Sequence, residues 1–375
     1  MSKKRKLSRL ILAAIPLAYN HLYQKSFGNR RSTDRMRSMP DVILPSNDFY
    51  IKEEGYAESM EEIVLPYLKT REEQGSFHTR HRISYSIFRA DEPKAAVVIS
   101  HGFGESVPRY YEAIYYFLHM GYDVFMPEHF GHGYSDSGVE DQTLVWVDSF
   151  DTYTDDFRFF LDHVVKKDRP NLPLVIYSHS MGGAITASCL EEYPNIADGA
   201  ILSAPMFQVF LFLPESIAYP LVGTLSKTAS SKSYFIGEKQ TERLMEGSFE
   251  LNRTSTHSKN RGSYSHHKRI TSDVPPRWVV TLGWAHEAMK TTHEIVREEN
   301  VKKIKVPMLM FQAGIDFYVD PKGMYEFAAY AEQLEFYKVH GSFHEIYTET
   351  DRIIVPYFNK IDKFIQGIIR KHEAT

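Results

Sequence analysis

The fold of this chain is decided by the stretch Leu174-Val175-Ile176-Tyr177-Ser178-His179-Ser180-Met181-Gly182-Gly183. Its four apolar residues predict a buried strand, and the small residues around Ser180 predict a sharp turn into a helix. A strand, a strained turn that carries a serine and a helix are typical of a nucleophile elbow. Ser178 stands where the pattern G-x-S-x-G usually has glycine, and a loop that is merely rich in serine and glycine is the alternative, so the context must decide.

Further apolar runs extend this pattern in both directions along the chain. Continuous apolar runs are typical of strands that are buried on both faces of a parallel sheet, and here they alternate with helical stretches at 109–120, 150–167 and 184–193. The sequence therefore predicts an α/β fold with a mainly parallel, doubly wound sheet. The predicted strands occupy residues 95–100, 122–126, 172–177, 199–202, 306–311 and, in a more polar form, 334–339, with an edge strand at 82–88 and a helix before residue 69.

The alternation of strands and helices stops between Pro205 and Lys305. About a hundred residues are too many for a simple connection in such a sheet, so we expect an inserted helical cap over about 207–303. The remainder of residues 41–375 forms the α/β domain in this interpretation. Hydrophobic content of 43% is typical of a globular chain, and no apolar run reaches the length of a membrane-spanning helix.

Residues 1–40 differ from the rest of the chain in charge. They contain ten Lys or Arg and one acidic residue, a net charge of +9, whereas the remaining residues carry −13. A signal peptide, a segment that lies on an anionic membrane surface and a disordered basic tail all fit this composition. Cys189 is the only cysteine, which excludes an internal disulfide framework and a cysteine-based metal site.

Three further features follow strands where an elbow enzyme needs them. The turn His101-Gly102-Phe103-Gly104 follows the strand at 95–100, and we expect the backbone N–H groups of Phe103 and Met181 to form an oxyanion hole. Asp316 follows the strand at 306–311 and is our candidate acid, with Asp320 as its rival. His344 follows the last strand, so the order Ser180, Asp316, His344 matches that of a hydrolase triad.

Other chemistry has weaker support in the sequence. We assign His101, Gly102 and His179 to the substrate pocket, where the histidines shape it or satisfy hydrogen bonds of the loops. The pair His266-His267 lacks the spacing of a zinc peptidase, and no phosphate-binding loop of the nucleotide hydrolases is present. We therefore expect no metal, no cofactor and no nucleic-acid partner. The basic residues at 259–269 fit a solvated loop or, more interestingly, a site for a phosphate-bearing headgroup.

Taken together, these motifs resemble a known family. The resemblance is to the α/β-hydrolase branch of bacterial lysophospholipases and monoacylglycerol lipases, which also includes enzymes described as serine aminopeptidases. It implies a cap after the elbow and hydrolysis of carboxylic esters of single-chain lipids. The matching motifs are His101-Gly102-Phe103-Gly104-Glu105-Ser106, Gly131-His132-Gly133-Tyr134-Ser135, residues 178–183, Ser203-Ala204-Pro205-Met206, Asp316 and Gly341-Ser342-Phe343-His344-Glu345.

Several alternatives stay open at this stage. A peptidase or small-ester hydrolase would use the same triad, and a ligand-binding protein could use the same scaffold without catalysis. In the cap, Trp278, Trp284 and Met289 either line an acyl pocket or pack its core. We expect a cytoplasmic protein that can associate peripherally with membranes through its basic N-terminus, with secretion as the alternative. The oligomeric state stays open.

Overall fold

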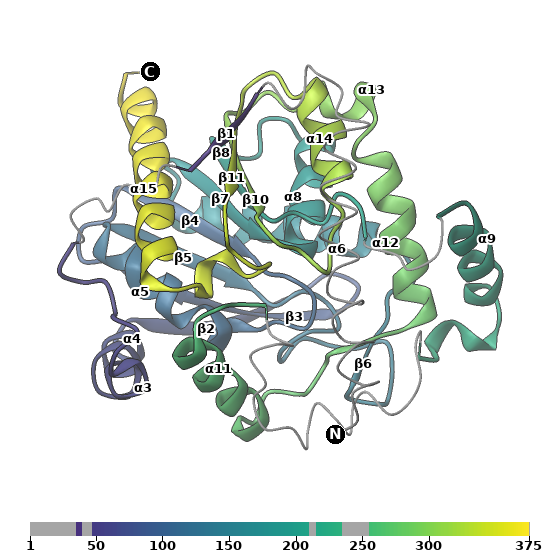
Figure 1. The fold of residues 1–375 in the computed structure, drawn as a ribbon, viewed down its shortest axis with the longest axis horizontal. Helices are drawn as coiled ribbons and strands as arrows, with labels where there is room; N and C mark the ends of the chain where they lie inside the picture. The colour runs from purple at the N-terminus through teal and green to yellow at the C-terminus, as the bar shows by residue number, and fades with distance from the viewer. Residues whose placement is uncertain (1–34, 40–46, 210–214, 235–254, 375) are drawn as a thin grey trace, which may run out of the picture.

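A nine-stranded sheet forms the centre of the molecule, with the strand order β1-β11-β10-β8-β7-β4-β5-β3-β2 (Figure 1). The computed structural model describes residues 35–39, 47–209, 215–234 and 255–374. The strands from β1 to β5 in this order are parallel, and β3 and β2 are antiparallel additions at one edge. The strands are β1 (Met36–Ser38), β2 (Glu72–His78), β3 (Arg82–Phe88), β4 (Ala95–Ser100), β5 (Tyr122–Pro127), β7 (Leu174–His179), β8 (Gly199–Ser203), β10 (Met308–Ala313) and β11 (Leu334–Val339).

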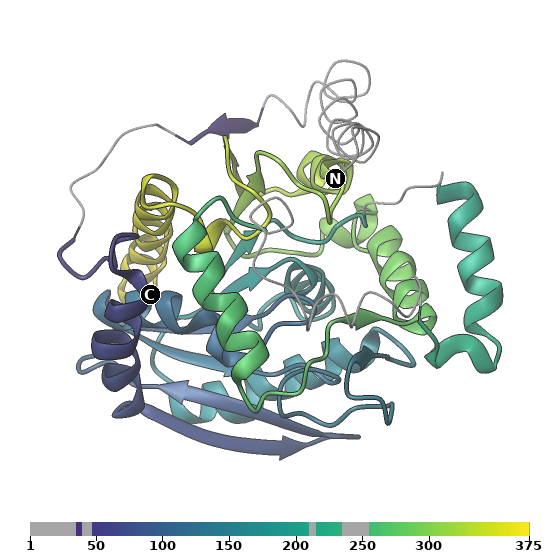
Figure 2. The same cartoon turned by 60° about the horizontal axis from the view of Figure 1, so that its bottom comes forward.

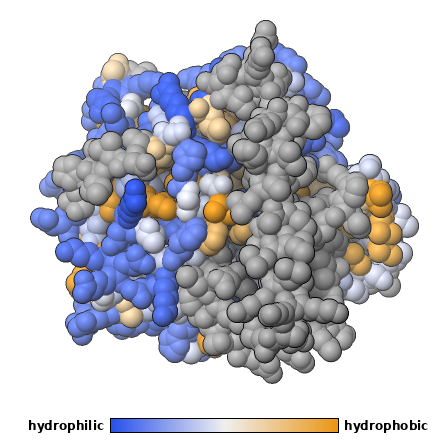
Figure 3. Space-filling model, viewed as in Figure 1, coloured by the Kyte–Doolittle hydropathy of each residue, from blue (hydrophilic) through white to orange (hydrophobic). Residues whose placement is uncertain are grey.

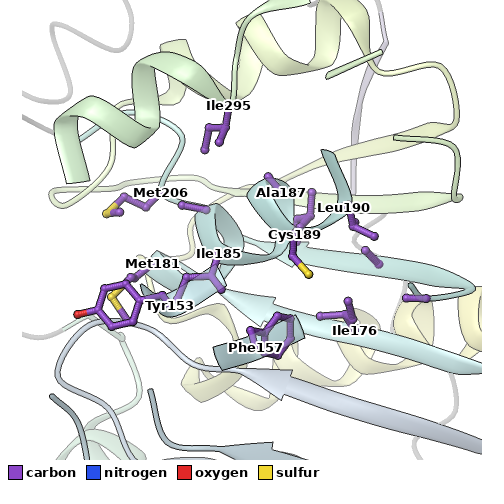
Figure 4. Close-up of a cluster of buried hydrophobic side chains, with 14 of the residues drawn as sticks. Tyr153, Phe157, Ile176, Met181, Ile185, Ala187, Cys189, Leu190, Met206 and Ile295 are labelled. Atoms are coloured by element: carbon purple, nitrogen blue, oxygen red, sulfur yellow. The ribbon is translucent and has the colours of Figure 1, made fainter. Parts of the chain in front are cut away.

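Helices cover both faces of this sheet, which explains why its central strands are continuously apolar. On one face, α5 and α15 enclose a hydrophobic core, and on the other face α6, α8 and α14 enclose a second one (Figure 1). Figure 4 shows Ile185 and Cys189 of α8 next to Phe157 of α6 and Ile176 of β7. The described helices that lie outside the interval between β8 and β10 are α3 (Tyr56–Ser59), α4 (Leu65–Lys69), α5 (Tyr111–His119), α6 (Asp151–Phe160), α7 (Lys166–Asp168), α8 (Met181–Glu192), α14 (Pro321–Tyr330) and α15 (Asp351–Glu373). Short π or 3₁₀ segments occur at η1 (Met60–Val64), η2 (Val107–Tyr110), η3 (Leu161–Val165) and η6 (Ile346–Thr348).

The interval between β8 and β10, which we name the cap, contains several helices and a short strand among its described residues. α9 (Glu215–Ser226) packs on α12 (Leu282–Glu294) through Val222, Ala285 and Met289. α11 (Lys259–Thr271) lies near α3, where the rings of Tyr56 and Tyr264 meet edge to face. The remaining elements are η4 (Ala229–Lys232), β9 (Val279–Val280), which pairs with β6 (Leu144–Val145) in a separate small sheet, and α13 (Glu298–Val301).

Four local predictions differ from the structure. Residues 259–269, interpreted as a solvated loop, lie in the helix α11, whose N-cap Ser258 accepts the Arg261 N–H. β3 is not an edge strand, because β2 pairs with its outer side. β2 was not predicted, since Phe77 is its only buried side chain and its sequence therefore lacks the pattern of a strand. The sequence from Trp278 to Lys290 has the pattern of an amphipathic helix, but the helix begins only at Leu282, because Val279 and Val280 pair with β6 and Thr281 caps the helix. Residues 36–38, assigned to the basic segment 1–40, form β1 and extend the sheet beside β11.

The other predictions for the basic segment concern residues 1–34 and lie outside the described residues. None of the described helices combines the length and the apolar composition that crossing a bilayer requires. The outer face of α9 does carry exposed apolar side chains at helical spacing, visible as the orange patch at the right of Figure 3. Ile217, Leu221 and Leu225 are 55%, 52% and 38% exposed.

Candidate active site

The strand β7 ends in the strained turn that the sequence predicts at Ser180. Ser180 has φ 50° and ψ −117°, a left-handed φ that a non-glycine residue adopts only under constraint, and it precedes the first residue of α8. A side chain on Gly182 would lie 1.9 Å from the Ser100 carbonyl oxygen, so only glycine fits. Ser178 fits the other small position because its hydroxyl donates a hydrogen bond to the Ile201 carbonyl at 3.0 Å. The elbow is therefore held between β4 and β8.

His344 and Asp316 meet at the same edge of the sheet. His344 Nδ1 lies 2.7 Å from Asp316 Oδ2, and the second carboxylate oxygen accepts the backbone N–H groups of Tyr318 and Val319 at 2.9 and 3.1 Å. Burial opposes the charged form of His344, but the Asp316 carboxylate outweighs it and raises the pKa of the imidazole. The pair can therefore hold an imidazolium cation.

The loops that carry these two side chains are joined to each other. The Ile315 N–H donates to the Ser342 carbonyl at 2.8 Å, and the Gly314 N–H donates to the Ser342 hydroxyl at 3.2 Å. Gly314 permits this contact, since a Cβ there would lie 2.7 Å from the Gly341 nitrogen. Because Gly341 turns with φ +73°, the loop after β11 folds back onto the loop after β10. The relative position of acid and base is thus set by backbone contacts.

His344 also lies against the elbow. The rings of His179 and His344 have centroids 4.8 Å apart, and His179 Nε2 is 3.3 Å from the His344 carbonyl oxygen. Ser180, which follows His179, is 8% exposed, while His344 and Asp316 are 6% and 4% exposed. The structure thus places the His344–Asp316 pair beside the turn that carries Ser180, and all three residues are nearly closed to solvent.

The rival acid, Asp320, has another position. It precedes α14, and its carboxylate accepts the Lys322 N–H at 2.9 Å as the N-cap of that helix. Among the described residues, His344 therefore pairs with Asp316 and not with Asp320.

The two expected oxyanion donors lie at the carboxyl ends of β4 and β7. Met181 is the first residue of α8, where a backbone N–H has no partner within the helix. In the described part of the chain, neither this N–H nor that of Phe103 donates a hydrogen bond. The turn that presents Phe103 contains Gly104 at φ +68°, and the Phe103 ring packs against Trp284 of the cap with centroids 4.5 Å apart.

Glu105, which had no role in the predicted site, fixes the turn at residues 101–104 where Phe103 lies. Its carboxylate accepts the Gly102 N–H at 2.6 Å and the hydroxyl groups of Tyr110 and Tyr347 at 2.5 and 2.9 Å, and it lies 3.3 Å from His179 Nδ1. Burial opposes ionisation, yet His179 and these hydrogen bonds hold the pKa of Glu105 below its usual range. The position of an acidic residue directly after a glycine-containing turn was the sequence signal that could have indicated this role of Glu105.

The residues assigned to the substrate pocket bond to the protein itself. His101 Nδ1 meets the Gly102 carbonyl at 2.8 Å and its Nε2 accepts the His129 N–H at 2.9 Å, while burial lowers the pKa of His101 to about 4. His179 lies between Glu105 and the His344 carbonyl. The sequence left open whether these histidines shape the pocket or satisfy hydrogen bonds of the loops, and their contacts match the second role.

A cavity of about 120 Å³ adjoins this site. It lies between the oxyanion turn, with Phe103 and Gly104, and the cap helix α11. Trp278 lines this cavity, whereas Met289 packs in the core of the cap. No group of three or more metal-ligating side chains occurs within the described ranges.

Fold, elbow and acid–base pair together define a serine hydrolase with the α/β-hydrolase fold. Residues 91–351 match the Hydrolase_4 family, described as serine aminopeptidase, S33, and the chain belongs to this family. It is 30% identical over 290 residues to lysophospholipase L2 of Escherichia coli K12, covering 73% of this chain and 83% of that protein. It is 26% identical over 279 residues to the monoglyceride lipase of Homo sapiens, covering 73% and 82%.

The fold is also that of solved hydrolases. A soluble variant of monoglyceride lipase from Saccharomyces cerevisiae, in complex with a substrate analog, superposes with a TM-score of 0.63. The match covers 80% of this chain and 94% of that chain at 18% identity, and it shows the shared fold alone. The family and the fold that the sequence predicts are thereby confirmed.

Proposed function

We propose that Ser180, His344 and Asp316 form a catalytic triad that hydrolyses the carboxylic ester of a single-chain lipid. The observation that carries this proposal is the buried His344–Asp316 pair, 2.7 Å apart, beside the strained turn at Ser180. A serine hydroxyl is a weak nucleophile unless a positioned base takes its proton, and a neutral imidazole held by a carboxylate is such a base.

The reaction proceeds in two halves. Ser180 Oγ attacks the ester carbonyl carbon while His344 Nε2 takes the hydroxyl proton, and the N–H groups of Phe103 and Met181 stabilise the oxyanion. The carbon–oxygen bond of the ester then breaks, and the alcohol leaves with the proton from His344. Water, deprotonated by His344, then attacks the acyl-enzyme, which releases the fatty acid and regenerates free Ser180. No metal or cofactor takes part in this scheme.

The names of the relatives and the surface of the cap support a lipid substrate. The relatives reported above are named lysophospholipase L2 and monoglyceride lipase, and both names imply an ester of a single acyl chain. Ile217, Leu221 and Leu225 expose apolar surface on α9, as a protein that meets lipid would (Figure 3). Lysophospholipids and monoacylglycerols are therefore the first substrates to test.

A second candidate is cleavage of amino-acid amides, which the family description favours. One panel separates the candidates: fatty-acid release from lysophospholipids, monoacylglycerols and short esters, and amine release from amino-acid amides. We expect the long-chain esters to be cleaved by the wild-type protein and not by Ser180→Ala. Turnover of amides with none of long-chain esters would overturn the lipid assignment.

A fluorophosphonate probe separates either enzyme from a binding protein on the same scaffold. We expect it to label wild-type protein and not folded Ser180→Ala protein. A folded wild-type protein that stays unlabelled would support the binding protein and contradict the triad.

We further propose that residues 1–40 attach the protein peripherally to anionic membranes from the cytoplasmic side. Their net charge of +9 supports this, since basic residues are attracted to anionic headgroups. Full-length protein should sediment with anionic vesicles but not with neutral ones, and replacing Lys3, Lys4, Arg5 and Lys6 by glutamine should weaken sedimentation. A mature N-terminus that begins after the apolar run at 10–18 would instead indicate secretion.

A further inference from the structure

The cavity beside the oxyanion turn is rich in positive charge. Figure 2 shows α11 in front of the sheet, and basic side chains of α11 and of the segment after it line the cavity. On the opposite side, the cavity is lined by the residues after β4 and by Glu345, which follows the base His344. A ligand in this cavity would therefore lie beside Phe103 and Gly104, while Ser180 and His344 are not among the residues that line it.

Three of the basic side chains have carboxylate partners. Arg261 pairs with Glu112 at 2.9 Å, and Lys268 pairs with Glu61 at 2.6 Å. Arg109 forms an ion pair with Glu345. These charges are balanced within the protein and need no ligand.

Arg269 and Arg277 differ from them, since neither has a carboxylate within ion-pair distance in the described part of the chain. Arg277 is 6% exposed, and its Nη2 donates to the Gln142 amide oxygen at 3.3 Å, while its Nε and Nη1 are buried without a hydrogen-bond partner. Arg269 Nε is likewise buried without a partner. Burial together with the like charge of Arg109 lowers the pKa of Arg269 to about 10, which still leaves it charged at neutral pH. Buried guanidinium N–H groups without an acceptor are unfavourable, and the oxygens of an anion would supply acceptors.

Arg269 is also fixed in place beside the oxyanion turn. Its guanidinium lies 3.9 Å above the Trp278 ring, and Nη2 is 3.5 Å from where a Cβ on Gly104 would be. The Arg277 carbonyl lies 3.2 Å from the same point, so the chain passes directly over Gly104. A planar guanidinium held in this way presents parallel N–H groups, the geometry that binds phosphate oxygens.

We propose that Arg269 and Arg277 form a subsite for the phosphate group of a lysophospholipid whose ester carbonyl lies in the oxyanion hole. In such a lipid only the glycerol backbone separates the ester from the phosphate, which matches a phosphate site next to Gly104. The enzyme then prefers phosphate-bearing single-chain lipids to neutral monoacylglycerols. This inference rests on the proposed ester hydrolysis, but binding can be measured without turnover.

The kinetic test compares two lipids with the same acyl chain, a 1-acyl lysophosphatidylglycerol and a 1-monoacylglycerol, in the same neutral detergent. We expect the Arg269→Gln variant to lose at least about tenfold in kcat/KM on the phospholipid, through KM, because a charge-assisted contact is lost. Its kcat/KM on monoacylglycerol should stay within about twofold of wild type. Equal losses on both lipids, or none on either, would overturn the subsite.

Matched controls separate the subsite from general charge effects. Lys259→Gln removes one positive charge from the exposed start of the same helix, away from the cavity, and should change neither activity. Arg277→Gln removes the second proposed ligand from a different segment and should reproduce the selective loss. Each variant loses one contact, the Arg269–Trp278 stacking or the Arg277–Gln142 hydrogen bond, so both should remain folded with at most a small loss in Tm, which is measured in parallel.

A binding arm decides the matter even if neither lipid is cleaved. We expect sn-glycerol 3-phosphate to raise the Tm of Ser180→Ala protein, and glycerol to leave it unchanged. The shift should vanish when Arg269→Gln is added. Inorganic phosphate at the same concentration should give a smaller shift; a larger one would indicate a site for free anions and contradict the headgroup assignment. No shift with either phosphate would overturn the proposal.

Discussion

Replacing Asp316 by asparagine should place the imidazole proton of His344 on the wrong nitrogen. One carboxylate oxygen accepts two backbone N–H groups, from Tyr318 and Val319, and an asparagine side chain would keep its carbonyl oxygen there. Its amide nitrogen would then face His344 Nδ1, 2.7 Å away, and would force that atom to accept a hydrogen bond. Nε2 would carry the proton, so His344 could no longer deprotonate Ser180.

The expected loss of kcat in Asp316→Asn follows from the same tautomer change in serine proteases, which lowers kcat by about 10⁴-fold. At about 1.36 kcal/mol for each factor of ten, this is about 5.4 kcal/mol of lost transition-state stabilisation. The assay is fatty-acid release from a monoacylglycerol, with Tm measured in parallel to show that Asp316→Asn is folded.

Asp320→Asn is the matched control. Asparagine is as good an N-cap as aspartate, so this variant should retain wild-type turnover and lose little stability. The reasoning would be refuted by an Asp316→Asn variant with kcat within about tenfold of wild type, or by a larger loss in Asp320→Asn.

Three further predictions follow from the contacts. The kcat/KM should rise with pH through the raised pKa of His344, above about 6.5, because its neutral form is the base; a flat profile between pH 5 and 8 would contradict this. Below about pH 6.5 the same raised pKa stabilises the fold, and this contribution is lost as pH rises through the folded value. Gly182→Ala should lower the free energy of unfolding in urea by at least about 3 kcal/mol, because its Cβ would overlap the Ser100 oxygen. As a control, Gly367→Ala in α15 should raise this free energy by up to about 1 kcal/mol, because alanine favours the helix and its Cβ has room there. Glu105→Gln should lower the free energy of unfolding by about 3 kcal/mol because it leaves a buried hydrogen-bond network incomplete; an unchanged urea midpoint would show that Glu105 does not anchor the turn.

The fold could be predicted because its central strands leave a strong signal. Strands such as β4 are buried on both faces and read as continuous apolar runs, and their boundaries were predicted closely. β2 was missed because an edge strand with one buried residue has no such pattern. The start of α12 was displaced because pairing of β9 with β6, a contact distant in sequence, outweighed the helical periodicity after Trp278.

The candidate triad could be selected because parallel strands bring their carboxyl ends to one edge. Residues that follow β7, β10 and β11 must then lie near each other, and His344 meets Asp316 as expected. Glu105 and the arginine cavity could not be derived in this way. The charge of residues 259–269 did suggest a headgroup site, but which of these side chains lacks a carboxylate partner depends on burial and on contacts distant in sequence. Arg277 lies outside that run and has no distinguishing signal in the sequence.

Ser180 should become acylated during turnover, and acid quenching of the enzyme while it hydrolyses a lysophospholipid traps this intermediate. Mass spectrometry of the digested protein should find the fatty acyl group on the peptide that contains Ser180. The acyl adduct should be absent from Ser180→Ala and should accumulate more slowly in Asp316→Asn. An acyl group on another residue, or turnover by Ser180→Ala at the wild-type rate, would contradict the account.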